Sequence, residues 1–388
     1  MQTSLVEQIF YSSKELLNSV RTEHGFIAAA ESAASQKRGY TSIFGRDASM
    51  CALAGLVSED EGLIEAGKQS LITLAEHASD IGQIPFSVNT ERKLVKYRMP
   101  QSIDSTIWWL LTFWLYTQKL SDTSLKAQYY AAFQEGITWL QNRMQYGLLE
   151  EGEGAGWADE LPRSGMVLYT NALWLLFLEH IKSAERKAIY HNFLYFFDYH
   201  TDTVRGYPEL QRQFPNFRNN LKKTKRKSQT FYASVSRFNL NESIDVFGNT
   251  LACISGALPR TRERAILKEL QDVADESPFL IRSMPEPERL HQGIFEATFQ
   301  NRAWQYHNAG VWPMIGGWYV YAHAKAGNMR VAHEALERLA EVNSLEKHPF
   351  PEWIHGRTGK TMGLDRQAWN AAVYILAYKA VTEGTFLV

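Results

Sequence analysis

The sequence predicts an all-α protein in which helical hairpins form two concentric rings, an α/α toroid with at most a small β-hairpin. Long segments such as residues 4–20 repeat apolar residues at the spacing of one helix face. Segments that are apolar all round alternate with amphipathic, charged segments, which is typical of buried helices covered by outer ones. Alternating strand patterns are almost absent, and residues 230–236 predict an edge hairpin at most.

The spacing of apolar residues and the positions of helix-breaking residues predict where each helix lies along the chain. Helices are expected over 4–20, 50–57, 62–78, 103–120, 124–144, 166–181, 184–200, 245–257, 261–274, 312–326, 329–342 and 367–382. Leu258-Pro259 separates one pair, and Gly327-Asn328 is the C-cap signal between two others. The apolar members begin with polar residues, and the loops before inner helices gather at one end of a toroid. The chemistry is therefore expected at that end.

Composition excludes several classes of function. The 41 basic and 42 acidic residues give a net charge of −1, which argues against a nucleic-acid-binding surface. Two cysteines, Cys51 and Cys253, fit a reducing compartment, and residues 1–20 do not resemble a signal peptide, so a cytoplasmic location is expected. The apolar run 107–115 is about half of a membrane span. We expect residues 1–388 to form one domain.

Motifs for other chemistries are missing. The glycines of 152–156 lack the Lys-Ser/Thr of a phosphate-binding loop, and no His-Glu-x-x-His or Gly-x-Ser-x-Gly motif occurs. His348 and His355 are a poor metal pair, so no metal or other cofactor is expected. Residues 212–227 hold seven basic and no acidic residues. They predict a solvated loop, or alternatively a contact for an anionic group.

Two carboxylates precede apolar helices. Asp47 follows Phe44-Gly45-Arg46, and Asp104 adjoins the helix that carries Trp108-Trp109. Either aspartate could be an ordinary N-cap. At the mouth of an apolar, aromatic tunnel, however, desolvation would raise the pKa of Asp104 toward that of a general acid.

Two further carboxylate segments lie in turns. Residues 157–160 place Asp159 and Glu160 beside Trp157, and residues 349–353 hold Glu352 in a loop made rigid by two prolines. A glutamate kept ionised there by Arg357 or Arg366 could act as a base. Two carboxyls on either side of a bond, roughly 6.5–9.5 Å apart, are the arrangement of an inverting glycosidase.

The motifs resemble those of known glycosidases. Ile103-Asp104-Ser105-x-x-Trp108-Trp109, Tyr306-His307-Asn308-Ala309-Gly310-x-Trp312-Pro313 and Pro351-Glu352-Trp353-x-x-Gly356-x-Thr358-Gly359 are similar to motifs of neutral/alkaline invertases. Gly45-Arg46-Asp47, Trp157-Ala158-Asp159 and Asn171-Ala172-Leu173-Trp174 resemble amylo-1,6-glucosidase domains of glycogen-debranching enzymes. Both families are six-hairpin glycosidases, so the resemblance implies an (α/α)6 barrel.

The resemblance also implies roles for individual residues. Asp104 is expected to be the general acid and Glu352 the general base of an inverting, exo-acting hydrolase. Its substrate would be a small saccharide with an α-glucosidic bond, resembling sucrose or an α-gluco-oligosaccharide. The expected substrate-binding residues are Arg46, Asp47, Trp108, Trp157, Asp159, Tyr306, His307, Asn308, Trp312, Trp353 and Arg366.

Two alternatives remain at this stage. A sugar epimerase or isomerase could use the same toroid, with His307 and His355 as acid and base. A non-catalytic carbohydrate-binding barrel is the other alternative, because tryptophan stacking serves binding and catalysis alike. The expected partner is a small saccharide, with no nucleic acid or membrane, and the oligomeric state is open.

Overall fold

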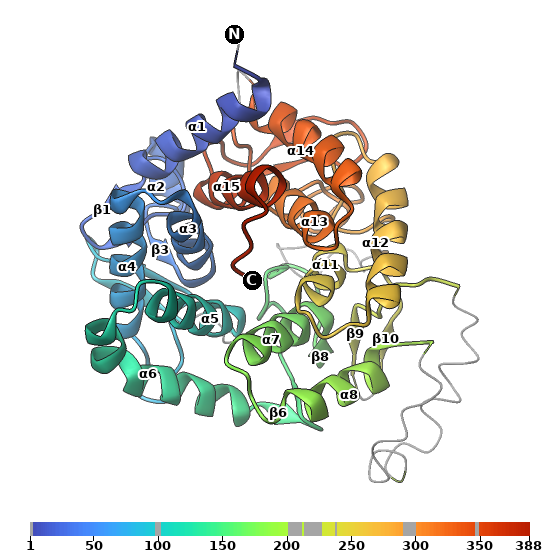
Figure 1. Ribbon diagram of the computed structural model, residues 1–388, viewed down its shortest axis with the longest axis horizontal. Coiled ribbons are helices and arrows are strands. Elements are labelled where there is room, and N and C mark those ends of the chain that lie inside the picture. Colours follow the sequence, from blue (N-terminus) through green and yellow to red (C-terminus); the bar gives the residue numbers. More distant parts are fainter. Residues whose placement is uncertain are drawn as a thin grey trace.

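The computed structural model describes residues 3–97, 102–200, 212, 227–236, 239–289, 300–345 and 349–388. Within this part of the chain, two concentric rings of helices form a toroid (Figure 1). The inner ring contains α3 (Gly45–Ser58), α5 (Asp104–Lys119), α7 (Leu168–His180), α11 (Val246–Ile254), α13 (Pro313–Lys325) and α15 (Ala368–Glu383). The outer ring contains α1 (Leu5–Ser19), α4 (Glu61–Glu76), α6 (Thr123–Gln141), α8 (Arg186–Phe197), α12 (Arg260–Asp275) and α14 (Met329–Asn343).

The inner ring is closed. Each inner helix packs against the next one in chain order, and α15 packs against α3 to complete the circle. The rings thus form the (α/α)6 barrel that the sequence predicts, with every expected helix present and its ends shifted by a few residues. The predicted basic segment 212–227 lies outside the described residues except at its two ends.

Local sequence explains where several helices begin. Ser4, Asp60, Asp122 and Asp245 are N-caps whose side chains accept a hydrogen bond from a backbone N–H three residues later. Asp47 and Asp104 are not caps, which corrects that reading of the sequence. Both lie within the first turn of their helices, which start at Gly45 and Asp104 itself, and neither helix has a side-chain cap bond.

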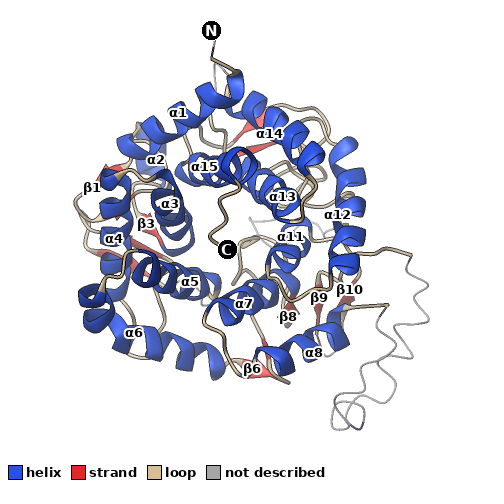
Figure 2. Cartoon of the chain, in the orientation of Figure 1, coloured by secondary structure: helices blue, strands red, loops and turns tan. Residues whose placement is uncertain are grey.

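Short strands are more numerous than predicted (Figure 2). They are β1 (Arg21–Thr22), β2 (Gly25–Phe26), β3 (Ile43–Phe44), β4 (Ser87–Asn89), β5 (Leu94–Lys96), β6 (Met144–Gln145), β7 (Leu148–Leu149), β8 (Met166–Val167), β9 (Ser234–Val235), β10 (Leu240–Asn241), β11 (Trp353–Ile354) and β12 (Thr361–Met362). All pairings are antiparallel, and two of the sheets, β3-β4-β5 and β8-β9-β10, have three strands. Segments of two or three residues are too short to show alternation, which is why the sequence underestimates them. The helix α2 (Ala33–Arg38) was also not predicted.

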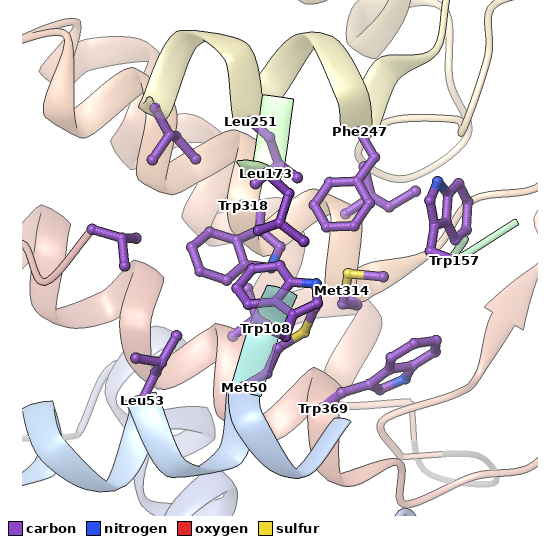
Figure 3. Close-up of a cluster of buried hydrophobic side chains, with 14 of the residues drawn as sticks. Met50, Leu53, Trp108, Trp157, Leu173, Phe247, Leu251, Met314, Trp318 and Trp369 are labelled. Atoms are coloured by element: carbon purple, nitrogen blue, oxygen red, sulfur yellow. The ribbon is translucent and has the colours of Figure 1, made fainter. Parts of the chain in front are cut away.

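The core fills the barrel axis (Figure 3). All six inner helices contribute to it, with Met50, Leu53, Trp108, Leu173, Phe247, Leu251, Met314, Trp318 and Trp369 among the side chains. Trp108 and Trp318 meet at the centre with ring centroids 5.5 Å apart, and both are completely buried. Packed side chains therefore occupy this part of the barrel axis, and a pocket lies at the end of the barrel.

Trp318→Ala should lower the free energy of unfolding by about 3–5 kcal/mol, because it leaves a cavity at the centre of this core. Urea denaturation followed by circular dichroism measures the change. Ile81→Ala is the control, since Ile81 is exposed and its loss should change stability by about 0.5 kcal/mol or less. Equal effects of the two substitutions would contradict the packing described here.

Candidate active site

A pocket of about 230 Å³ lies at the end of the barrel where the inner helices begin. Its walls come from the first turns of α3 and α15, from α2 and the residues after it, from β4 and β5, and from the loops that precede α7, α13 and α15. The lining includes many polar and aromatic side chains, namely those of Arg38, Tyr40, Arg46, Asp47, Trp157, Asp159, Glu160, Tyr306, His307, Trp312, Glu352, Gln367 and Trp369. This is the end at which the sequence predicts the chemistry.

Glu352 is a buried carboxylate in the pocket wall. Its Oε1 accepts a hydrogen bond from Tyr40 Oη at 2.9 Å, and its Oε2 accepts one from the Leu364 N–H at 2.9 Å. Arg38 Nη1 lies 3.4 Å from Oε2. Burial raises the pKa of Glu352 above its ordinary value, while Leu364, Tyr40 and Arg38 oppose that rise. These contacts orient the carboxylate and favour the ionised form that a general base needs.

The backbone next to Glu352 requires a glycine. Gly363 has a positive φ of 75°, and a Cβ atom on it would clash with Glu352 Oε2. The absence of a side chain at this position therefore lets the chain turn closely around the carboxylate.

Asp104 lies below the pocket and does not line it. Its side chain is completely buried, and Arg46 Nη1 donates a hydrogen bond to Oδ2 at 2.8 Å. Tyr169 Oη donates to the same oxygen at 3.1 Å, and Ser102 Oγ donates to Oδ1 at 2.9 Å. Trp108 Nε1 in turn donates to Tyr169 Oη. Both carboxylate oxygens of Asp104 thus act as acceptors within a buried network.

Two other aspartates line the pocket. Asp47 is buried, and burial raises its pKa to about 6, with Arg46 lowering it and Asp104 and Asp159 raising it further. Asp159 is half-buried, and its charge also raises the pKa of Glu352. The negative charge of Asp159 therefore disfavours ionisation of both Asp47 and Glu352.

Aromatic rings form the deep part of the pocket. The His307 ring stacks on Trp312, with centroids 5.1 Å apart and an interplanar angle of 17°. Trp157 meets both rings edge-on, at 5.0 Å from His307 and 5.8 Å from Trp312. Tyr306 packs against Trp312 at 5.0 Å. Such a wall offers apolar faces to the C–H groups of a sugar ring.

Four predicted binding residues lie outside the pocket lining. Trp108 belongs to the axial core, and Trp353 is buried against Tyr306. Asn308 uses its carboxamide to bind backbone groups of Glu288 and Asn301, so it braces the loop rather than facing a ligand. Arg366 is exposed. Sequence spacing cannot distinguish such residues from their pocket-lining neighbours, because the loops that carry them are irregular.

Several residues of the lining were not predicted from the sequence, among them Arg38, Tyr40, Gln367 and Trp369. The cation beside Glu352 is Arg38, not Arg357 or Arg366, and Tyr40 donates the hydrogen bond that orients the carboxylate. Gln367 and Trp369 line the pocket from the start of α15, and both are buried, with Gln367 Nε2 and Trp369 Nε1 lacking a hydrogen-bond partner in the described part of the protein. No local signal marks Arg38 or Tyr40, which lie 314 and 312 positions away from Glu352.

Tyr40→Phe should move the acidic limb of the kcat/KM profile to higher pH. The hydrogen bond from Tyr40 lowers the pKa of Glu352, so its loss raises that pKa and the carboxylate becomes protonated at a higher pH. Initial rates between pH 4 and 8 measure the shift. Tyr130→Phe, which removes an exposed hydroxyl, should leave the profile unchanged. An unshifted limb in Tyr40→Phe would show that Tyr40 does not act on the base.

The described residues show neither a metal cluster nor a membrane-crossing helix. Within them, no group of three or more His, Cys, Asp or Glu side chains could hold a metal ion. None of the helices among them is both long enough and apolar enough to cross a membrane.

Comparison with solved structures defines the class of fold. A GH63 mannosylglycerate hydrolase from Thermus thermophilus, solved with glucose, superposes with a TM-score of 0.64 at 12% identity, covering 95% of this chain and 99% of that one. A rhamnosidase from Klebsiella oxytoca superposes with a TM-score of 0.62 at 13% identity, covering 99% and 65%. The chain therefore has the six-hairpin (α/α)6 fold found in glycosidases.

Sequence comparison identifies the particular relatives. Residues 237–383 match the family of alkaline and neutral invertases. Probable alkaline/neutral invertase F of Arabidopsis thaliana is 28% identical over 163 residues, which are 40% of this chain and 32% of that protein. Cytosolic invertase 1 of Oryza sativa subsp. japonica is 26% identical over 164 residues, 40% of this chain and 29% of that protein. The expected resemblance to neutral/alkaline invertases is confirmed, and the matched segments span about a third of the length of these relatives.

The family match covers only part of the pocket. Residues 237–383 include Glu352 and the aromatic residues Tyr306, His307 and Trp312, but not Asp47, Asp104 or Asp159. Glu352 and the aromatic wall therefore lie inside the matched segment, and the three aspartates lie outside it.

Proposed function

We propose that this protein is an inverting, exo-acting glycoside hydrolase of the cytoplasm, with residues 1–388 as one catalytic domain. Its substrate would be a small saccharide with an α-glucosidic bond. The observation that carries the proposal is one small pocket lined by Glu352, by three further carboxyls and by stacked aromatic rings. A pocket at the end of the barrel favours removal of a terminal sugar, and two carboxyls suffice for hydrolysis with inversion.

Glu352 is the proposed general base. It would take a proton from the water that attacks the anomeric carbon, while the glycosidic oxygen leaves with a proton from the acid. Tyr40 and Arg38 hold the carboxylate in place, and the aromatic wall would orient the sugar ring.

The motif resemblance and the position in the pocket favour different carboxyls as the acid. The motif resemblance implies Asp104, but a proton donor must come within hydrogen-bond reach of the glycosidic oxygen. Asp104 is completely buried, and both of its oxygens accept hydrogen bonds from Arg46, Tyr169 and Ser102. Asp159 lines the pocket and interacts electrostatically with Glu352. We therefore favour Asp159 as the acid and assign Asp104 the role of fixing Arg46.

The alternative of an epimerase or isomerase, with His307 and His355 as acid and base, has less support than the hydrolase. His307 lines the pocket, but its ring is stacked on Trp312, and His355 uses Nδ1 to accept backbone N–H groups of the turn that follows it. The pair of axial histidines that an epimerase would need is therefore not present among the described lining residues.

Proton NMR of the protein with sucrose, isomaltose, maltose, glucosylglycerate and a branched limit dextrin tests the proposed function. We expect one of these to be cleaved, with β-glucose as the first anomer released from an α-linked substrate. Release of α-glucose first would exclude inversion. Epimerisation of a free sugar without bond cleavage would establish the isomerase alternative. Sugar binding without any turnover, by saturation-transfer NMR, would establish the binding-only alternative.

A further inference from the structure

The loop that carries Trp157 and Asp159 is closed at its base. Residues 151–165, here the site loop, begin and end at Glu151 and Gly165, which exchange backbone hydrogen bonds of 2.9 and 2.8 Å. Within the loop, Ala155 O accepts a hydrogen bond from the Ile103 N–H at 3.0 Å. The positions of Trp157 and Asp159 therefore depend on the side chains that are buried beneath this loop.

The Glu151 side chain provides that support. It is buried beneath the loop, where Thr170 Oγ1 on α7 donates a hydrogen bond to Oε2. A Cβ atom on Gly156 would lie 3.1 Å from Glu151 Oε1 and 3.4 Å from Tyr169 Cδ1, so the backbone that precedes Trp157 rests directly on the carboxyl group. A cavity of about 10 Å³ beside it is also lined by Trp157 and Tyr169.

No cation is dedicated to Glu151 among the described residues. The charge of Arg163, on the same loop, lowers the pKa of Glu151. The guanidinium of Arg163, however, lies 3.6 Å from Asp245 Oδ2 and 3.0 Å from Glu288 Oε1. Asp104 on α5 and Asp245 at the start of α11 face Glu151 with like charge. Burial raises the pKa of Glu151 to about 8; Thr170 lowers it, and the two aspartates raise it further.

We propose that Glu151 is a positioning residue of the proposed glycosidase, which holds Trp157 and Asp159 in the pocket while its carboxyl group is neutral and releases the site loop when it ionises. An ionised carboxylate there would be buried next to two like charges without an ion pair of its own, which is strongly unfavourable. Movement of the loop into solvent relieves that cost. The inference rests on the proposed function only for its effect on catalysis.

Hydrogen–deuterium exchange of the unliganded protein tests the effect on the loop directly. Glu151→Gln keeps the shape of the neutral carboxyl and cannot ionise. At pH 4.5 the site loop should exchange nearly equally in the variant and the wild type, whereas at pH 9 it should exchange severalfold faster in the wild type. Glu150→Gln, the same change at the exposed neighbour, should behave as wild type at both pH values. Equal exchange of the variant and the wild type at pH 9, or a loosened loop in Glu151→Gln at pH 4.5, would overturn the proposal.

Thr170→Val provides a second test that does not depend on the glutamine variant. The Thr170 hydrogen bond lowers the pKa of Glu151, so its removal should move the pH at which the loop loosens upward. A packing defect alone would loosen the loop without moving that midpoint, and an unmoved midpoint would count against the proposal.

Stability and kinetics separate this inference from the proposed function. Because the folded pKa of Glu151 lies above its unfolded value, the wild type loses stability as pH rises from about 4.5 to about 8, and Glu151→Gln does not. The Tm advantage of the variant should grow across that window and stay constant above it. With a substrate in hand, kcat/KM of the variant should match wild type at pH 6.5 and exceed it at pH 9. Failure to find any substrate would leave the exchange and Tm results to decide the role of Glu151.

Discussion

Glu352→Gln is expected to lower kcat by about 10²–10⁴-fold with a small change in KM. The amide keeps the size of the carboxylate, and its oxygen can still accept a hydrogen bond from Tyr40 or Leu364, but it cannot take a proton from water. The loss should therefore fall on the chemical step and not on sugar binding. Steady-state kinetics with the substrate identified by NMR measures both parameters.

Two further measurements make the Glu352 result interpretable. Glu341→Gln, the same change at an exposed position on α14, should retain wild-type kinetics. Calorimetric binding of the substrate to Glu352→Gln should give a Kd close to the wild-type KM, which shows that the pocket is intact. Wild-type turnover in a folded Glu352→Gln variant would exclude Glu352 as the base and, with it, the proposed mechanism.

Asp159→Asn should lower kcat/KM by about 10²–10⁴-fold for a sugar leaving group, and much less for a leaving group that departs without a proton. A glucosyl fluoride, in which fluoride leaves unprotonated, is such a substrate. The ratio of the two losses measures how much proton donation Asp159 supplies. Comparison of kcat/KM for the natural saccharide and the fluoride, in wild type and variant, provides that ratio.

Asp104→Asn should give a different pattern. Removal of the carboxylate leaves the buried Arg46 without its ion-pair partner, and breaking a buried pair in this way costs about 3–5 kcal/mol. We expect a lower Tm and similar losses with both substrates, because the defect would lie in the position of Arg46. A loss in Asp104→Asn that is large for the saccharide and small for the fluoride would instead establish Asp104 as the acid.

The sequence predicts the toroid well because the same pattern, an apolar helix paired with an amphipathic one, recurs along the chain. Six apolar helices alternate with amphipathic ones, and each assignment supports the next. The short strands and α2 could not be predicted, since two to six residues show no period and their pairing depends on distant segments.

The site was predicted in part. Glu352 stands out locally, because prolines and aromatic residues surround it in the chain. The roles of Asp104 and Asp159 cannot be separated in this way. Both occur beside tryptophans, and the difference is that Arg46, 58 positions before Asp104, binds one of them below the pocket. Arg38 and Tyr40 meet Glu352 from the opposite end of the chain, where no motif marks them.

The closed inner ring has a consequence for folding kinetics. The hydrogen bond between Tyr40 and Glu352 spans 312 positions, and α15 must pack against α3 before the circle is complete. Contacts between such distant segments form slowly, because a long stretch of chain must be ordered before they contribute any stability. During refolding from urea, helical circular dichroism should therefore recover before enzymatic activity does. We expect the proposed base, Glu352, to gain its orienting partner Tyr40 late in assembly, so recovery of activity should report closure of the ring.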